Sequence, residues 1–102
     1  MILGIADSVN GVPIRLTDER WEHILDSHPE LASYRETVLD AVGDPEYILR
    51  GHKRTLIAVA HLGEHSYLNV VYRELSHTDG FIITARIERR LDRSKIIWRR
   101  DN

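Results

Sequence analysis

Short apolar segments separated by turn residues fill the second half of the chain and constrain its fold more than any other feature. The segments are Tyr47–Arg50, Thr55–Leu62, Tyr67–Leu75, Phe81–Glu88 and Ile96–Trp98. Each has the length of a β-strand, and Gly63-Glu64 and Thr78-Asp79-Gly80 between them are typical of tight turns. Strands joined by short turns pair in antiparallel fashion, so this half predicts an antiparallel meander.

The first half of the chain has the pattern of a β-hairpin followed by two helices. Asn10-Gly11 lies between two apolar segments and is a strong hairpin signal. Thr17 is suited to cap a first helix that runs to about Ser27, because its side-chain oxygen can accept a hydrogen bond from the first helical turn. Pro29 ends that helix and suits the first turn of a second, which we expect from about Pro29 to Val42.

The order of these elements predicts the architecture. A chain of 102 residues, 42% of them hydrophobic, is expected to form one domain (residues 1–102) with a core of modest size. A hairpin, two helices and a meander predict an α+β fold, with both helices on one face of a four- to five-stranded, mostly antiparallel sheet. We expect the other face to stay partly open.

Residue usage narrows the class of protein. The absence of cysteine excludes disulfides and thiolate–zinc sites, and it suits the reducing cytoplasm. No apolar run approaches the roughly 20 residues of a membrane span, and the first residues lack a basic-then-apolar leader. We therefore expect a cytoplasmic protein without membrane contact.

The net charge of −2 hides a strong asymmetry along the chain. Residues 1–46 contain ten acidic and three basic side chains, whereas residues 47–102 contain six acidic and eleven basic ones. Nine of those eleven are arginines, whose planar guanidinium suits phosphate recognition. The asymmetry predicts either a basic binding face or solvated strand edges and a basic tail.

Two histidines lie close together in the first helix. Histidine can exchange a proton near neutral pH, so His23 and His28 are candidates for acid–base chemistry. At about 100° per residue, His28 falls on the apolar stripe with Trp21 and Leu25, while His23 points toward water. Metal-binding histidines on a helix usually sit four residues apart on one face, so this spacing disfavours a metal site.

Strand alternation sorts the meander into two faces. In Tyr67–Leu75, we expect Leu68, Val70 and Tyr72 to face the core, with Tyr67, Asn69, Val71 and Arg73 opposite. In Phe81–Glu88, the expected core side is Phe81, Ile83, Ala85 and Ile87, with Ile82, Thr84, Arg86 and Glu88 opposite. Together these assignments predict a cationic, hydrogen-bonding surface around Arg86 that suits a phosphate.

Three groups of segments resemble the barnase–EndoU–colicin–RelE superfamily of small ribonucleases, most closely its phage-type branch. The segments are Ile14–Thr17 with Trp21–Leu25 and His28–Leu31, then Tyr67–Val71, then Gly80–Arg86 with Ile97-Trp98. The resemblance implies two helices packed on a small antiparallel sheet, as in RelE and barnase. It also implies an RNA substrate, cleavage that needs no metal or cofactor, and a toxin-like or effector-like role.

The leading hypothesis is thus a metal-independent endoribonuclease. Such cleavage needs a base for the ribose 2′-hydroxyl, an acid for the leaving oxygen and a cation for the charge on phosphorus. His28 or His23 would transfer protons and Arg86 would stabilise the phosphorane. The assisting and RNA-binding candidates are Thr84, Asn69, Arg73, Tyr67, Lys53, Arg54 and Trp98. The partners implied are RNA, an antitoxin or immunity protein and, through an exposed sheet edge, a second copy of the chain.

Structural interpretations of the same residues stay open. His28 can serve to end a helix, His23 can be an exposed surface residue, and Trp98 can anchor an edge strand. Arg86, Thr84 and the Lys53-Arg54 pair can be surface strand and turn residues. The alternative function is a catalytically inactive RNA- or protein-binding module with the same fold. A zinc protein is the least favoured alternative, because cysteine is absent.

Overall fold

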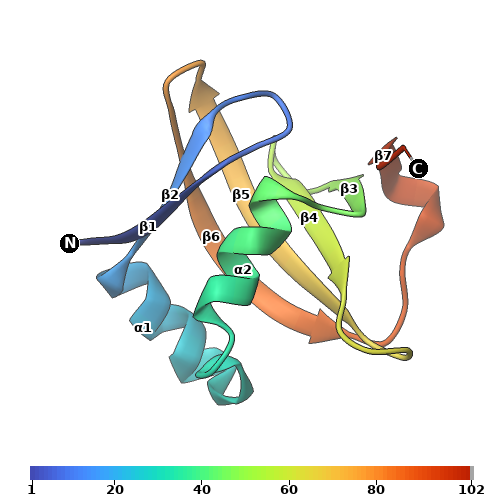
Figure 1. Ribbon diagram of the computed structural model, residues 1–102, viewed down its shortest axis with the longest axis horizontal. Helices are drawn as coiled ribbons and strands as arrows, with labels where there is room; N and C mark the ends of the chain where they lie inside the picture. Colours follow the sequence, from blue (N-terminus) through green and yellow to red (C-terminus); the bar gives the residue numbers. More distant parts are fainter. Residues whose placement is uncertain (102) are drawn as a thin grey trace.

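The computed structural model describes residues 1–101 and has an α+β fold with one mixed sheet and two α-helices (Figure 1). The strands are β1 (Ile2–Asp7), β2 (Pro13–Thr17), β3 (Tyr47–Arg50), β4 (Leu56–His61), β5 (Tyr67–Ser76), β6 (Asp79–Glu88) and β7 (Ile96–Arg99). The helices are α1 (Asp18–Ser27) and α2 (Arg35–Gly43), with short 3-10 helices η1 (Pro29–Leu31) and η2 (Arg93–Lys95). No helix within the described residues is long and apolar enough to cross a membrane.

The sheet is larger than the four to five strands expected from the sequence. All seven strands join in the order β1-β2-β6-β5-β4-β3-β7. The N-terminal hairpin enters the sheet because β2 pairs in parallel with β6, through Ile14 with Gly80 and Arg15 with Phe81. A Cβ atom at Gly80 would lie 2.5 Å from Ile14 Cδ1 of β2 and 2.6 Å from the Arg73 carbonyl oxygen of β5, so glycine lets β6 lie close to both neighbouring strands.

Both helices pack against one face of the sheet, as expected. Trp21 and Ile24 of α1 and Val38 and Val42 of α2 are buried in the main hydrophobic cluster. From β5, this cluster includes Leu68, Val70 and Tyr72, which are fully buried, so the core face expected for this strand is confirmed. We call the opposite side of the sheet the helix-free face.

A β-bulge changes the expected faces of β6. Val71 pairs with Thr84 and Tyr72 with Ile82, so Ile83 is an extra residue in β6. Beyond the bulge, Ala85 and Ile87 pack against the core as predicted. Before it, Ile82 is buried in the core instead, and Phe81 faces the other way. The core assignment of Phe81 and Ile83 was therefore wrong, because one inserted residue reverses the alternation.

The helix boundaries agree with the sequence at α1 and differ at α2. The Thr17 hydroxyl accepts a hydrogen bond from the Arg20 N–H at 3.2 Å, which caps α1 as expected. The second helix was expected to begin at Pro29, but residues 29–31 form a 3-10 turn and α2 starts at Arg35. The Tyr34 N–H donates a hydrogen bond to the Leu31 carbonyl, three residues back instead of four. This tighter turn separates η1 from α2.

Candidate functional site

A basic pocket of about 460 Å³ opens on the helix-free face. Its lining residues come from β3, β4, β5, β6, η2 and the turn between β3 and β4: Arg50, Gly51, His52, Lys53, Thr55, Ile57, Val71, Arg73, Ile83, Thr84, Arg86 and Lys95. Five of these residues are Lys or Arg, and none is Asp or Glu. The pocket therefore attracts anions.

Register between neighbouring strands brings the predicted residues together. The antiparallel pairing of β5 with β6 sets Asn69 beside Arg86 and Val71 beside Thr84. Pairing of β4 with β5 adds Ile57 beside Val71, which gives the pocket an apolar floor. Arg73, Thr84 and Arg86 thus line one cavity, as strand alternation implied.

The turn between β3 and β4 adopts an unusual backbone conformation. Lys53 and Arg54 have φ angles of 51° and 66°, in the left-handed region that favours glycine. Two hydrogen bonds from Thr55 close the turn, since its N–H and its hydroxyl both donate to the His52 carbonyl, at 3.1 and 2.7 Å. The Arg73 Nη2 atom also donates to the Lys53 carbonyl at 2.7 Å, which fixes the turn against β5.

Buried polar atoms beside the pocket lack hydrogen-bond partners within the described residues. They are Arg73 Nε and Asn69 Oδ1, and the whole Asn69 residue is only 6% exposed. Arg86 is oriented by its Nε, which donates to Glu88 Oε1 at 2.7 Å. Because buried polar atoms normally have hydrogen-bond partners, these two atoms are exceptions next to the pocket.

The helical histidines lie away from this pocket. α1 packs on the face of the sheet opposite to Arg86, and neither His23 nor His28 is among the lining residues. His23 is exposed, as expected, while His28 ends α1 with its ring Nδ1 3.6 Å from Glu30 Oε2. The expected convergence of a helical imidazole with Arg86 is therefore wrong, because the sheet separates them.

Four further candidates lie outside the pocket lining: Asn69, which is buried beside Arg86, and Arg54, Tyr67 and Trp98. Arg54 lies in the same turn as Lys53, but only Lys53 lines the cavity. Tyr67 starts β5, and its ring centroid lies 4.6 Å from that of His61. Trp98 is half-buried on the edge strand β7, where it pairs with Ile48 of β3.

Sequence reasoning missed His52, Arg50 and Lys95 as pocket residues. His52 is exposed, yet it lines the cavity beside Lys53. Arg50 ends β3, and Lys95 arrives on η2 from a distant part of the chain. The left-handed Lys53-Arg54 turn that presents these groups gives no signal in the sequence, because such turns usually contain Asn-Gly.

A second imidazole on this face is held by a carboxylate. His61 pairs with Tyr67 across β4 and β5, and its Nδ1 lies 2.7 Å from Glu46 Oε1. The His61 main-chain N–H also donates to Glu46 Oε2 at 2.5 Å. Partial burial acts to raise the pKa of Glu46, but the two His61 hydrogen bonds outweigh it and hold that pKa below its ordinary value.

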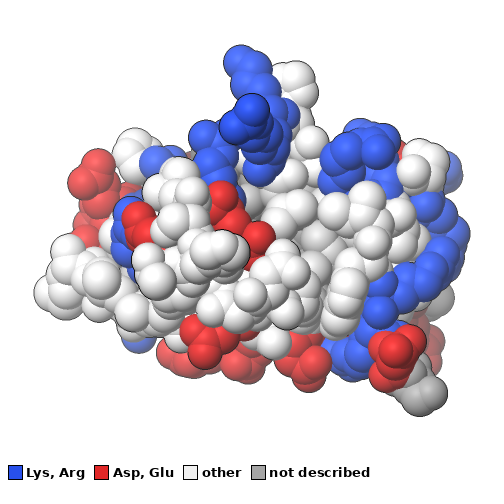
Figure 2. All heavy atoms as spheres, turned by 90° about the horizontal axis from the view of Figure 1, so that it is seen from above, with Lys and Arg blue, Asp and Glu red and all other residues white. Residues whose placement is uncertain are grey.

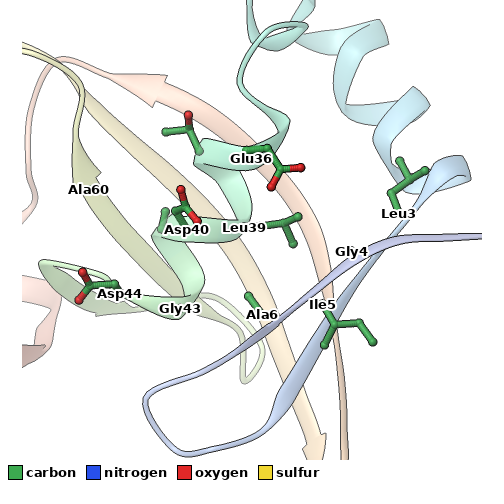
Figure 3. Close-up of a pocket in the computed structure, with 12 residues that line it drawn as sticks. Leu3, Gly4, Ile5, Ala6, Glu36, Leu39, Asp40, Gly43, Asp44 and Ala60 are labelled. Atoms are coloured by element: carbon green, nitrogen blue, oxygen red, sulfur yellow. The ribbon is translucent and has the colours of Figure 1, made fainter.

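Basic side chains gather on part of the surface. On the face seen in Figure 2, Lys and Arg concentrate at the top and along the right, while Asp and Glu lie on the left, in the centre and along the lower margin, where some adjoin basic groups at the lower right. A second cavity, of about 620 Å³, lies between β1 and α2 (Figure 3). Its acidic side chains are Glu36 and Asp40 of α2 and Asp44, which follows the helix, so it repels the anions that the basic pocket attracts.

No protein-family model, no curated protein and no solved structure matches this chain. Residues 1–101 also contain no cluster of three or more histidine or carboxylate side chains placed to hold a metal ion.

Proposed function

We propose that this protein is a metal-independent endoribonuclease with a RelE- or barnase-like fold, a toxin-like member of the phage-type branch of that superfamily. One observation carries the proposal: five cationic side chains and no carboxylate line a single cavity on the helix-free face. Phosphate contacts from Arg and Lys supply most of the affinity for nucleic acids, so this cavity suits an RNA backbone.

The pocket residues suggest how a phosphodiester would bind and react. Arg86 and Arg73 would hold the phosphate oxygens, and Lys53 would contact a neighbouring phosphate. The ribose 2′-oxygen would attack phosphorus as the bond from phosphorus to the 5′-oxygen breaks. His52, the imidazole in the lining, would take the 2′-hydroxyl proton, and the 5′-oxygen would take a proton from water.

Cleavage of a labelled RNA in excess EDTA tests this proposal. We expect the wild-type protein to cleave RNA but not DNA of the same sequence, which lacks the attacking 2′-hydroxyl. Arg86→Ala is expected to slow cleavage by about 100-fold or more, because one donor to the transition state is lost. His52→Gln is expected to slow it comparably, whereas His65→Gln, at a side chain 92% exposed, serves as the matched control.

Three results would contradict the proposed cleavage. Equal rates for wild type and Arg86→Ala would place any cleavage outside the basic pocket. Wild-type protein that degrades DNA and RNA alike would exclude attack by the 2′-hydroxyl. Loss of all activity on adding EDTA, restored by a divalent metal, would show that the reaction requires a metal.

The second candidate is a non-catalytic RNA- or protein-binding module. It is favoured by the shortage of proton-transfer groups, since His52 is the one histidine in the lining and cleavage needs both a base and an acid. Such a module would bind RNA with full dependence on Arg86 and leave the RNA intact. Gel analysis of the bound RNA separates the two functions.

The proposed activity also suggests partners and a location. A cytoplasmic ribonuclease endangers its own cell, so we propose an antitoxin or immunity protein that covers the basic pocket with acidic side chains. We also propose a homodimer through the exposed edge strand β1, where Ile2 and Ile5 are 51% and 57% exposed. Light scattering of the purified protein tests the dimer.

A further inference from the structure

The β6 bulge moves an aromatic ring to the edge of the basic pocket. Phe81 precedes the extra residue Ile83, so it lies on the helix-free face instead of in the core. There it pairs with Arg73 of β5 on one side and with Arg15 of β2 on the other. The ring is partly exposed, whereas the next residue, Ile82, is 1% exposed.

The Arg15 guanidinium is held in place beside this ring. Its Cζ atom lies 5.8 Å from the Phe81 ring centroid, within the range of a cation–π contact. Arg15 Nη1 donates to the Gly80 carbonyl at 3.2 Å and forms an ion pair with Asp79. The aromatic ring and the guanidinium therefore form a fixed pair.

A hollow of about 200 Å³ adjoins the ring, lined by Arg15, Thr17, Arg20, Phe81 and Ile82. Its lining combines an aromatic ring with two arginines and has no carboxylate. Arg73 links it to the basic pocket, because Arg73 both lines that pocket and pairs with Phe81. A ligand with a flat π-system and a phosphate could occupy both places at once.

We propose that Phe81 and Arg15 form a stacking subsite for one nucleobase of a single-stranded RNA whose phosphates occupy the basic pocket. This subsite rests on the proposed RNA-binding function and specifies that the RNA bound is single-stranded. A base in a duplex is stacked on its neighbours and presents no free π-face to a protein ring. Proteins that bind single strands combine a positive groove with such aromatic platforms.

The experiment compares a short fluorescent oligoadenylate with an oligonucleotide of the same backbone that lacks all bases. Binding to the full chain is measured by fluorescence anisotropy at one fixed salt concentration. Phe81→Leu, which keeps an apolar side chain without a π-face, is expected to weaken oligoadenylate binding by about 5- to 100-fold. Binding of the abasic strand should not change, and Phe81→Trp should restore oligoadenylate binding.

Leu75→Ala is the matched control, because Leu75 is an apolar side chain, 53% exposed, outside both cavities. Unchanged oligoadenylate affinity in Phe81→Leu would overturn the subsite while leaving the proposed RNA binding intact. An equal loss of affinity for the oligoadenylate and for the abasic strand would also overturn the subsite, since the ring would then act only by positioning Arg15 and Arg73. If wild-type protein binds neither strand, both the proposed function and the subsite fail.

Discussion

The Glu46 carboxylate accepts two hydrogen bonds from one residue, the ring and the main-chain N–H of His61. Glu46 immediately precedes β3, and His61 is the last residue of β4. The contact therefore joins the start of one strand to the end of its partner, next to Tyr67 on the helix-free face.

This contact predicts a pH-dependent contribution to stability. Because the folded-state pKa of Glu46 is below its ordinary value of 4.5, the stabilisation is complete above that value and is lost as pH falls through the folded-state pKa. Glu46→Gln is expected to lower the free energy of unfolding by about 1 kcal/mol at neutral pH. Urea titrations should show the gap to wild type closing in acid; a gap that is independent of pH would contradict the assignment.

Arg86 predicts a change in the salt dependence of RNA binding. If its guanidinium contacts a phosphate, Arg86→Ala should reduce the slope of log affinity against log salt concentration by about 0.7 for a single strand. Arg35→Ala removes the same charge from the exposed surface of α2 and should leave the slope unchanged. Equal slopes for all three proteins would show that Arg86 does not contact phosphate.

The strained turn predicts opposite effects on stability and binding. Glycine at position 54 would relieve the left-handed φ of 66°, so Arg54→Gly should raise the free energy of unfolding by about 1 kcal/mol. Lys53→Gly should stabilise similarly but also weaken RNA binding, because Lys53 lines the basic pocket and Arg54 does not. Thermal unfolding and anisotropy measure the two effects, and a destabilised Arg54→Gly protein would argue against the turn conformation.

The buried hydroxyl of Tyr72 predicts a stabilising substitution. Tyr72 is fully buried, its hydroxyl has no hydrogen-bond partner within the described residues, and burial raises its pKa. Tyr72→Phe removes that unsatisfied group and should raise the free energy of unfolding by about 1 kcal/mol. Tyr67→Phe, at a partly exposed ring on the other face, should change it by less than about 0.5 kcal/mol. A less stable Tyr72→Phe protein would reveal a partner for the hydroxyl.

The sequence predicted those features that depend on neighbouring residues. The alternation in β5 correctly separated Leu68 and Val70 from Arg73, because both faces of a regular strand follow from its period of two. The cap at Thr17 was also predicted, because it involves only residues of the next helical turn. The gathering of Thr84 and Arg86 on one face also followed, because β5 and β6 form a local hairpin.

Features that depend on distant or inserted residues were not predictable. The bulge at Ile83 reversed the face of Phe81, although the residue pattern of β6 is that of a regular strand. The pairing of β2 with β6 involves segments far apart in the chain, so the sequence suggested a smaller sheet. His52 and Lys95 reach the basic pocket from a turn and a 3-10 helix, whose paths no periodicity describes.

The parallel contact between Arg15 and Phe81 has a consequence for the order of assembly during synthesis. A ribosome makes roughly 5–20 residues per second from the N-terminus, so β2 exists well before β6 can join it. Until then β2 lacks its neighbour in the sheet, and the hollow beside Phe81 has not formed. The proposed stacking subsite, which needs Arg15 of β2 and Phe81 of β6 side by side, would therefore be completed only late in synthesis, when β6 pairs with β2.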